Sequence, residues 1–294
     1  MSQLMAMFCD IDDFCKWFEP LYRPHLLQSS QRQRVRQGQL TLSEIMTIIV
    51  YFHRSPYRDF KHYDTEYVAG HLRLYFPTLV SSSRFVELMP RTLVPLCGYL
   101  HTRKGRCTGI TFVDSTARAV CHNRRSNRHK VCAGYATRGK SSMGWFYGFK
   151  LPLMVNDEGE LVAFRVTTAG GNDQGPVGRM ARRLWGQLFG DRGSISRALH
   201  QALWAQELAL ITLRRRNMKP RLMRLGDRLM LRKRFLIETI NDQVKNSSQI
   251  EHSRHRSLTG FMVNLVGGLL AYPFQPQKPS LGLWRGESGL PVVV

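Results

Sequence analysis

The spacing of apolar residues changes near residue 105 and divides the chain into two parts. In the first part, apolar side chains recur every three or four residues, as at Ile45, Ile48 and Phe52, which is the period of an amphipathic helix. Thr41 and Glu44 have the spacing of a capping box, in which each side chain bonds to the backbone at the other residue. We therefore expect a helix to begin after Thr41.

Residues 1–105 are accordingly predicted to form an all-α domain, with a further helix after residues 81–83. Short helices with abundant Arg and His are typical of a helix-turn-helix unit that binds DNA. A structural helical domain with a solvated basic face has the same features, so the residues leave both interpretations open.

The second part begins with strands. Residues 109–114, 145–155 and 160–167 have strand-like patterns, and residues 156–159 are predicted to form a hairpin turn between the last two. The elements expected after them are a helix at 176–184, a short strand ending at Asp191, a helix at 195–206, a strand at 208–213 and a helix across 235–245.

This order, β-β-β-α-β-α-β-α, is that of the ribonuclease H fold. The sequence therefore predicts an α/β (α+β) protein, in which a ribonuclease H-like catalytic domain at 106–272 contains a mixed five-stranded sheet and follows the all-α N-terminal domain. The Pro- and Gly-rich tail at 273–294 is expected to be loose.

The charge of the chain indicates the class of partner. Lys and Arg number 43 against 21 Asp and Glu, a net charge of +22, and such an excess favours binding to a nucleic acid. The longest apolar runs, 45–52 and 261–272, are shorter than the ~20 residues that cross a bilayer. We expect a cytoplasmic protein with no membrane partner. The six cysteines contain no Cys-x-x-Cys pair and are expected to be reduced.

Two isolated acids indicate the chemistry. Asp114 is the only Asp or Glu between Glu87 and Asp157, in a stretch rich in Lys and Arg, and Asp191 is the only acid between Asp173 and Glu207. Each follows a short apolar run, so we expect both at the ends of strands.

Glu238 lies in the helix predicted across 235–245. Spacings of four and seven place Arg234, Glu238 and Lys245 on one stripe of that helix. Carboxylates are preferred ligands of Mg²⁺ and Mn²⁺, and two such ions about 4 Å apart serve phosphoryl transfer on DNA. We expect Asp114 to bridge two ions, with Asp191 and Glu238 each completing one.

Each acid also has a structural interpretation. Asp114 and Asp191 would be strand-end or cap residues, and Glu238 would form an ion pair with Arg234 at i,i+4. Each structural interpretation is stronger for one acid taken alone, whereas the three acids in a matching order of elements favour the metal site.

The chain resembles the DDE transposases of bacterial insertion sequences, most closely the insertion sequence 982 family. The segments that carry the resemblance are residues 113–116, 129–130, 138–151, 189–193, 231–238 and 251–257. Pro152, Ser194 and Leu231 depart from the pattern, and Pro152 requires its strand to be at an edge or bent, because proline has no N–H.

The resemblance implies a Mg²⁺-dependent catalytic site at Asp114, Asp191 and Glu238. It implies cleavage at the ends of the element, attack of the freed 3′ hydroxyl on target DNA, and Arg234 and Lys245 on DNA phosphates. The partners would be the terminal inverted repeats and target DNA, bound by a homodimer or a larger assembly. We also expect Lys130 and Lys140, in the basic region around Asp114, to bind phosphates.

Residues 214–234 contain ten Lys or Arg against one Asp. The segment is interpreted as a surface that follows DNA, with Arg214, Arg215 and Arg216 in contact with phosphates, although a solvated helical face has the same composition. Two other functions remain open: a nuclease of the same fold without strand transfer, and a basic nucleic-acid-binding protein without catalysis.

Overall fold

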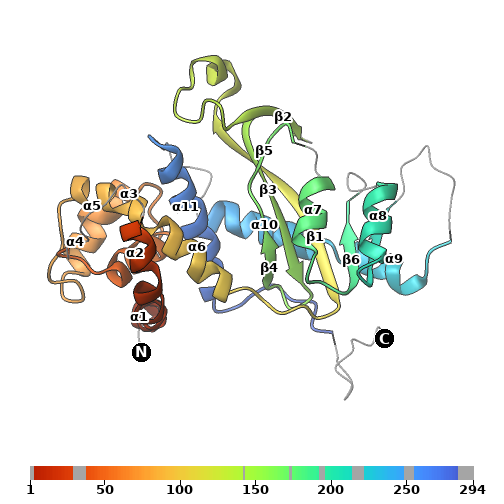
Figure 1. Ribbon diagram of the computed structural model, residues 1–294, viewed down its shortest axis with the longest axis horizontal. Helices are drawn as coiled ribbons and strands as arrows, with labels where there is room; N and C mark the ends of the chain where they lie inside the picture. Colours follow the sequence, from red (N-terminus) through yellow and green to blue (C-terminus); the bar gives the residue numbers. More distant parts are fainter. Residues whose placement is uncertain are drawn as a thin grey trace. The chain divides into compact units, whose positions relative to one another are not determined.

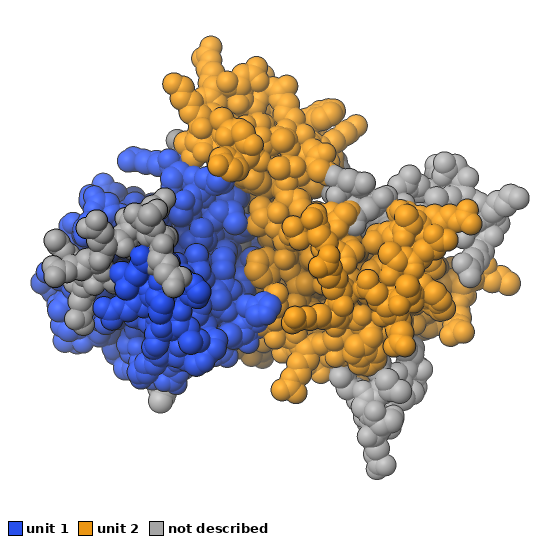
Figure 2. All heavy atoms as spheres, viewed as in Figure 1, with its two compact units in different colours: residues 1–103, 244–275 blue, residues 104–243, 276–294 orange. Residues whose placement is uncertain are grey.

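The computed structural model describes residues 3–28, 38–141, 143–171, 174–191, 196–213, 222–247 and 255–283 (Figure 1). The chain divides into two compact units, coloured separately in Figure 2. The helical unit comprises Met1–Arg103 and Val244–Gln275, and the sheet unit comprises Lys104–Gln243 and Pro276–Val294. This division differs from the expected one at 244–272, which we had placed with the catalytic domain.

The reason lies in helix α11 (Leu258–Ala271). Its side chains are apolar on almost every side, and Leu265, Leu269 and Leu270 are completely buried. A helix that is apolar all round belongs inside a core. Helix α11 packs against α2 (Leu42–Phe52) and α6 (Leu93–Thr102) within the helical unit.

Two helices of the helical unit, α2 and α5, begin where the sequence predicts. Thr41 caps α2 in a complete capping box, and its backbone N–H donates to Glu44 at 2.7 Å. Ser81 caps α5. The remaining elements of this unit are α1 (Gln3–Gln28), α3 (Phe60–His62), the π-helix η1 (Tyr63–Val68), α4 (Ala69–His71), α5 (Ser82–Leu88), the 3₁₀ turn η2 (Met89–Thr92) and the 3₁₀ turn η6 (Tyr272–Phe274).

Among the described residues, the sheet unit contains the expected α/β elements together with two additional strands and two additional helices. Its strands are β1 (Ile110–Cys121), β2 (Thr137–Ser141), β3 (Gly144–Asn156), β4 (Leu161–Phe164), β5 (Thr167–Thr168), β6 (Gly186–Gly190) and β7 (Leu208–Thr212). Its helices are the 3₁₀ helix η3 (Asn123–Arg128), α7 (Gln174–Met180), α8 (Arg197–Trp204), α9 (Leu225–Arg232) and α10 (Phe235–Asp242), and the π-helical turn η5 (Gln243–Ser247) follows α10.

Among the described residues, the strands form one mixed sheet of seven, in which β4-β3-β1-β6-β7 is the ribonuclease H-like core. Strands β1, β3 and β4 are antiparallel neighbours, and β6 and β7 run parallel to β1. The sequence analysis predicted these five strands. The two additional strands, β2 and β5, both pair with β3.

The two faces of the sheet have different covers. Val113 and Met154 belong to an apolar cluster with residues of α7 and α8, such as Leu199 and Leu203. Asp114 and Leu153, the next residues along the same two strands, are paired with each other and therefore point to the other face, where α10 packs against β1.

Pro152 lies in β3, which has neighbours on both sides rather than an edge position. On one side it is paired with Ser115 of β1. On the other side the neighbouring strands β4 and β5 are interrupted, and the N–H of Arg165 between them donates to the Pro152 carbonyl at 3.1 Å. The sheet accommodates the proline at a break in the adjoining ladder. Ser194 lies outside the described residues.

Other expectations concern single features. All six cysteines are free thiols, as predicted. Residues 276–283 of the expected loose tail belong to the sheet unit, and the N–H of Leu281 donates to the Asp157 carbonyl at 2.9 Å. In the part of the chain that the structure describes, no helix is long and apolar enough to cross a membrane.

Candidate active site

The parallel pair β1 and β6 brings two of the predicted acids together. The last paired residues of these strands are Phe112 and Phe189. Two positions further along each strand are Asp114 and Asp191, so the two carboxylates leave adjacent strands at the same level. Asp191 directly follows the end of β6, as predicted.

The expectation that Asp114 ends its strand is wrong. Strand β1 continues from Asp114 to Cys121, because it remains paired with β3 after its pairing with β6 stops. The carboxylate therefore stands in the interior of a long strand, at the point where one neighbour ends and space opens beside it. Its side chain is 26% exposed.

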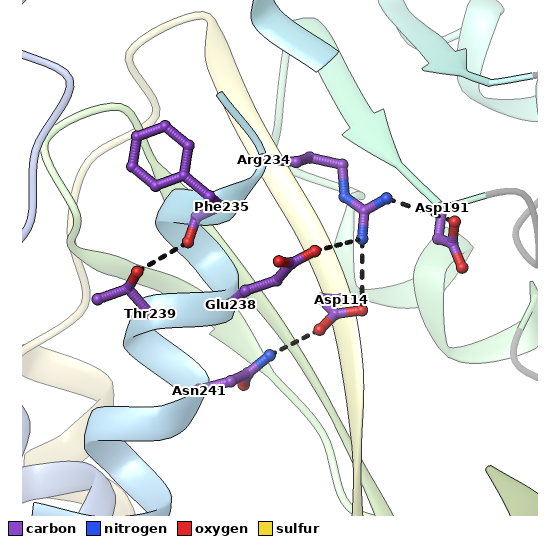
Figure 3. Close-up of polar contacts among 7 residues, drawn as sticks. All are labelled: Asp114, Asp191, Arg234, Phe235, Glu238, Thr239 and Asn241. Atoms are coloured by element: carbon purple, nitrogen blue, oxygen red, sulfur yellow. Dashed lines mark hydrogen bonds and ion pairs between the residues drawn. The ribbon is translucent and has the colours of Figure 1, made fainter. Parts of the chain in front are cut away.

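Helix α10 supplies the third acid. Its buried residues Leu236, Ile237 and Ile240 anchor it, and Glu238 projects on the polar side of the same helix. This amphipathic pattern fixes the rotation of α10 about its axis, so Glu238 is presented toward Asp114 (Figure 3).

The guanidinium of Arg234 joins the three carboxylates (Figure 3). Its Nη1 lies 3.4 Å from Asp191 Oδ1, and its Nη2 lies 3.8 Å from Asp114 Oδ1 and 3.6 Å from Glu238 Oε1. The Arg234 side chain is 14% exposed, whereas those of Asp191 and Glu238 are each 61% exposed. Three acids from three separate elements therefore face one positive charge.

Asn241 contacts Asp114, a role that the sequence did not predict for it. Its Nδ2 donates to Asp114 Oδ2 at 2.8 Å, and its side chain is buried. The only signal in the sequence is its position three residues after Glu238, which places both on one side of α10. The second Asp114 oxygen is thus held from the helix while the first faces Arg234.

Burial is the main influence on the acidity of Asp114. It raises the pKa of this carboxyl above the usual value for aspartate, because a charged group loses solvation there. Arg234 opposes the shift, while the negative charges of Glu238 and Asp191 add to it. The negative charge of Asp114 is therefore unfavourable unless a cation lies nearby, which suits a site that binds a positive ion.

Both structural interpretations can be compared with this geometry. The i,i+4 ion pair between Arg234 and Glu238 is present. Asp191 does not cap α8, whose N-cap is Ser196, and Asp114 lies inside a strand. The i,i+4 pair accounts for Glu238, and neither aspartate caps a helix among the described residues. The strand-end interpretation holds for Asp191, which directly follows β6, and not for Asp114.

The structure describes three of the other predicted phosphate-binding residues. Lys130 follows η3 and Lys140 lies within β2, and both side chains are exposed. Lys245 is half-buried in η5, whose π-helical winding departs from the regular α-helical spacing that we assumed between it and Glu238. Arg214, Arg215 and Arg216 lie outside the described residues.

As the side chains stand, no group of three or more His, Cys, Asp or Glu in the described part of the chain is arranged to hold a metal ion. At the carboxylates, the guanidinium of Arg234 lies where the three acids converge. Comparison with curated proteins found no match. A family model described as a transposase DDE domain matches residues 104–258, which is more than half of the 294 residues and includes all three acids. The chain therefore belongs to the transposases that have a DDE domain.

Proposed function

We propose that this transposase cleaves DNA at the ends of its element and joins the freed 3′ hydroxyl to target DNA, using Asp114, Asp191 and Glu238 as its catalytic carboxylates. The observation that carries the proposal is their convergence on Arg234 from β1, from the end of β6 and from α10. An ion pair needs only one acid, so the meeting of three indicates a site for concentrated positive charge.

The donor set fits Mg²⁺ or Mn²⁺. Three carboxylates offer hard oxygen ligands, two of them exposed enough to admit ions and substrate. Asp114, Asp191 and Glu238 would hold two ions, with Asp114 shared. Such ions supply an activated water or hydroxyl nucleophile and stabilise charge on the phosphate and on the leaving oxygen.

The other side chains would position these groups and the DNA. Asn241 fixes one oxygen of Asp114, so that the other remains directed toward the centre of the site. The guanidinium of Arg234 presents several N–H donors in a plane, a shape that suits a phosphate as well as a carboxylate. Arg234 would therefore exchange its carboxylate contacts for a DNA phosphate.

Other cations would hold the rest of the DNA. Lys130, Lys140 and Lys245, together with Arg214, Arg215 and Arg216, are proposed to bind phosphates along the bound strands. We also propose membership of the insertion sequence 982 family, recognition of terminal inverted repeats, and a dimer or larger assembly, because two DNA ends have to be paired. The nucleoid would be its place of action.

Strand transfer distinguishes this function from that of a nuclease with the same site. The purified protein would be incubated with Mg²⁺, supercoiled plasmid and a duplex bearing the inverted repeat that flanks the gene. Molecules in which the duplex is covalently joined to the plasmid are expected. Nicked or hydrolysed DNA without joined products would instead identify a nuclease.

A further inference from the structure

The far end of β3 carries an arm that the catalytic proposal does not use. We define the arm as residues 122–141 and 143–148, which comprise η3, β2 and the start of β3. Among the described residues, strand β2 pairs with this end of β3 and with no other strand. Figure 1 shows β2 and the segment before it extending past the part of the sheet beside α7 and α8.

On one face of the arm, two cations of β2 lie beside two aromatic rings of β3. Lys140 is paired with Trp145, and Arg138 is paired with Tyr147. Paired residues of antiparallel strands point to the same face, as do residues two apart on one strand. The four side chains therefore share one face, where Trp145 is 65% exposed.

This face is the same one that carries Asp114. Asp114 is paired with Leu153 of β3, and Leu153 is eight residues from Trp145. The even separation keeps both on one side of β3, because the register shift in this stretch adds a residue to β1, between Ala119 and Cys121, and none to β3. At ~3.3 Å per residue, the exposed ring lies about 26 Å along the strand from the carboxylate. Leu151 and Phe149, which lie between them on this face, are buried, so the exposed ring and the carboxylate are separate sites.

The charge of the region matches such a partner. Residues 115–156 contain no Asp or Glu and eight Lys or Arg. The exposed cations are Arg124, Arg125, Arg128, Lys130, Arg138 and Lys140. Arg138 donates to Ser126 Oγ at 2.7 Å, which holds η3 beside β2 and gathers these cations next to the aromatic face.

An exposed ring beside two cations suits a particular form of DNA. In a paired duplex the flat faces of the bases are covered by their neighbours, whereas an unpaired base can stack on an aromatic side chain. We propose that the arm binds DNA at a locally unpaired site, with Trp145 stacked on an exposed base and Arg138 and Lys140 on the adjoining phosphates. This inference rests on the proposed function only in taking DNA as the partner.

The test compares two DNA probes without metal, so that cleavage plays no part. The full chain would be titrated with a short duplex containing a central mismatched bubble, and with the same duplex fully paired. Trp145→Ala is expected to weaken binding to the bubble by about 5- to 100-fold. Binding to the paired duplex should change by less than about twofold, and Trp145→Phe should restore most of the affinity for the bubble.

Trp204→Ala is the matched control, because Trp204 is equally exposed but belongs to α8 on the other face of the sheet. It should leave both affinities unchanged. An equal reduction on both probes with Trp145→Ala, or no reduction on either, would overturn the stacking proposal. Neither result bears on the catalytic carboxylates, whose function is measured separately with Mg²⁺ present.

Discussion

At the scale of single residues, Arg234 decides how the metal-free site is held. Its guanidinium faces three carboxylates at 3.4–3.8 Å, distances that are long for ion pairs. These contacts hold Asp114, Asp191 and Glu238 together when no other cation is near. The positive charge of Arg234 offsets the repulsion between the three carboxylates.

Arg234→Gln should therefore make the protein depend on metal for stability. Without Mg²⁺ we expect a loss of roughly 1 kcal/mol, since the distances are long and two of the acids are exposed. Added Mg²⁺ should raise Tm more than in the wild type, because the ion replaces the missing charge. Thermal unfolding with and without Mg²⁺ measures this. An equal rise of Tm with Mg²⁺ in the wild type and in Arg234→Gln would argue against a site that Arg234 and the metal both occupy. Arg182→Gln, which replaces an exposed cation elsewhere, is the control.

Asn241 is expected to act through Asp114. Asn241→Leu keeps a side chain of similar size but removes the hydrogen bond of 2.8 Å to the carboxylate. Loss of a residue that orients a metal ligand typically costs about 10- to 100-fold in activity, so the cleavage rate should fall by that factor while DNA affinity is retained. Thr239→Ala, on the exposed side of the same helix, should leave cleavage unchanged; if both variants behave alike, Asn241 has no positioning role.

At the scale of elements, a half-buried histidine packs at the start of α11. His255 packs edge-on against Phe261 with ring centroids 5.5 Å apart, and Ser257 caps the helix between them. Burial lowers the pKa of His255 to about 4.

This pKa predicts a loss of stability in acid. The unfolded chain, with a histidine pKa near 6.5, binds a proton that the folded protein excludes until about pH 4. The free energy of unfolding should thus fall as pH decreases through that window, by about 2 kcal/mol between pH 7 and pH 5. Urea unfolding of His255→Gln should show a flatter pH dependence. His25→Gln, an exposed histidine, should keep the wild-type slope, and identical slopes for wild type and His255→Gln would refute the assignment.

The elements also show which features the sequence could predict. Apolar periodicity located β1, β3, β4, β6 and β7, and the Thr41 capping box located the start of α2. Apolar periodicity did not locate β2, because residues 137–141 are mostly polar and pair through their backbone with β3. It placed Asp114 at a strand end, since the apolar run stops there although β3 remains paired with the strand. The meeting of Arg234 with Asp191 depends on pairing across the fold, which periodicity does not encode.

At the scale of the whole molecule, we expect only some of the cations behind the net charge of +22 to contact DNA. If the arm follows DNA, its cations release counterions on binding and those on the opposite face do not. Replacing Arg124, Arg125 and Arg128 together with Ala should lower the slope of log affinity against log salt concentration by about 0.9 for each phosphate that the variant no longer neutralises. The same replacement of Arg214, Arg215 and Arg216 is predicted to lower it as well.

Arg179, Arg182 and Arg183 provide a control of equal charge. They are exposed in and after α7, on the face of the sheet away from Asp114. Their replacement by Ala should leave the slope near that of the wild type. A common slope for all three triple variants would mean that charge acts without a defined DNA path.

The central claim is that the three carboxylates form the catalytic centre. Asp114→Asn tests it most directly, because the amide preserves the size of the side chain and its place beside Asn241 but removes the charge. With Mg²⁺ and an end-bearing duplex, we predict that cleavage falls by about a thousandfold or more, while metal-free DNA affinity and Tm stay close to wild type. Wild-type cleavage by Asp114→Asn at unchanged DNA affinity would contradict the account.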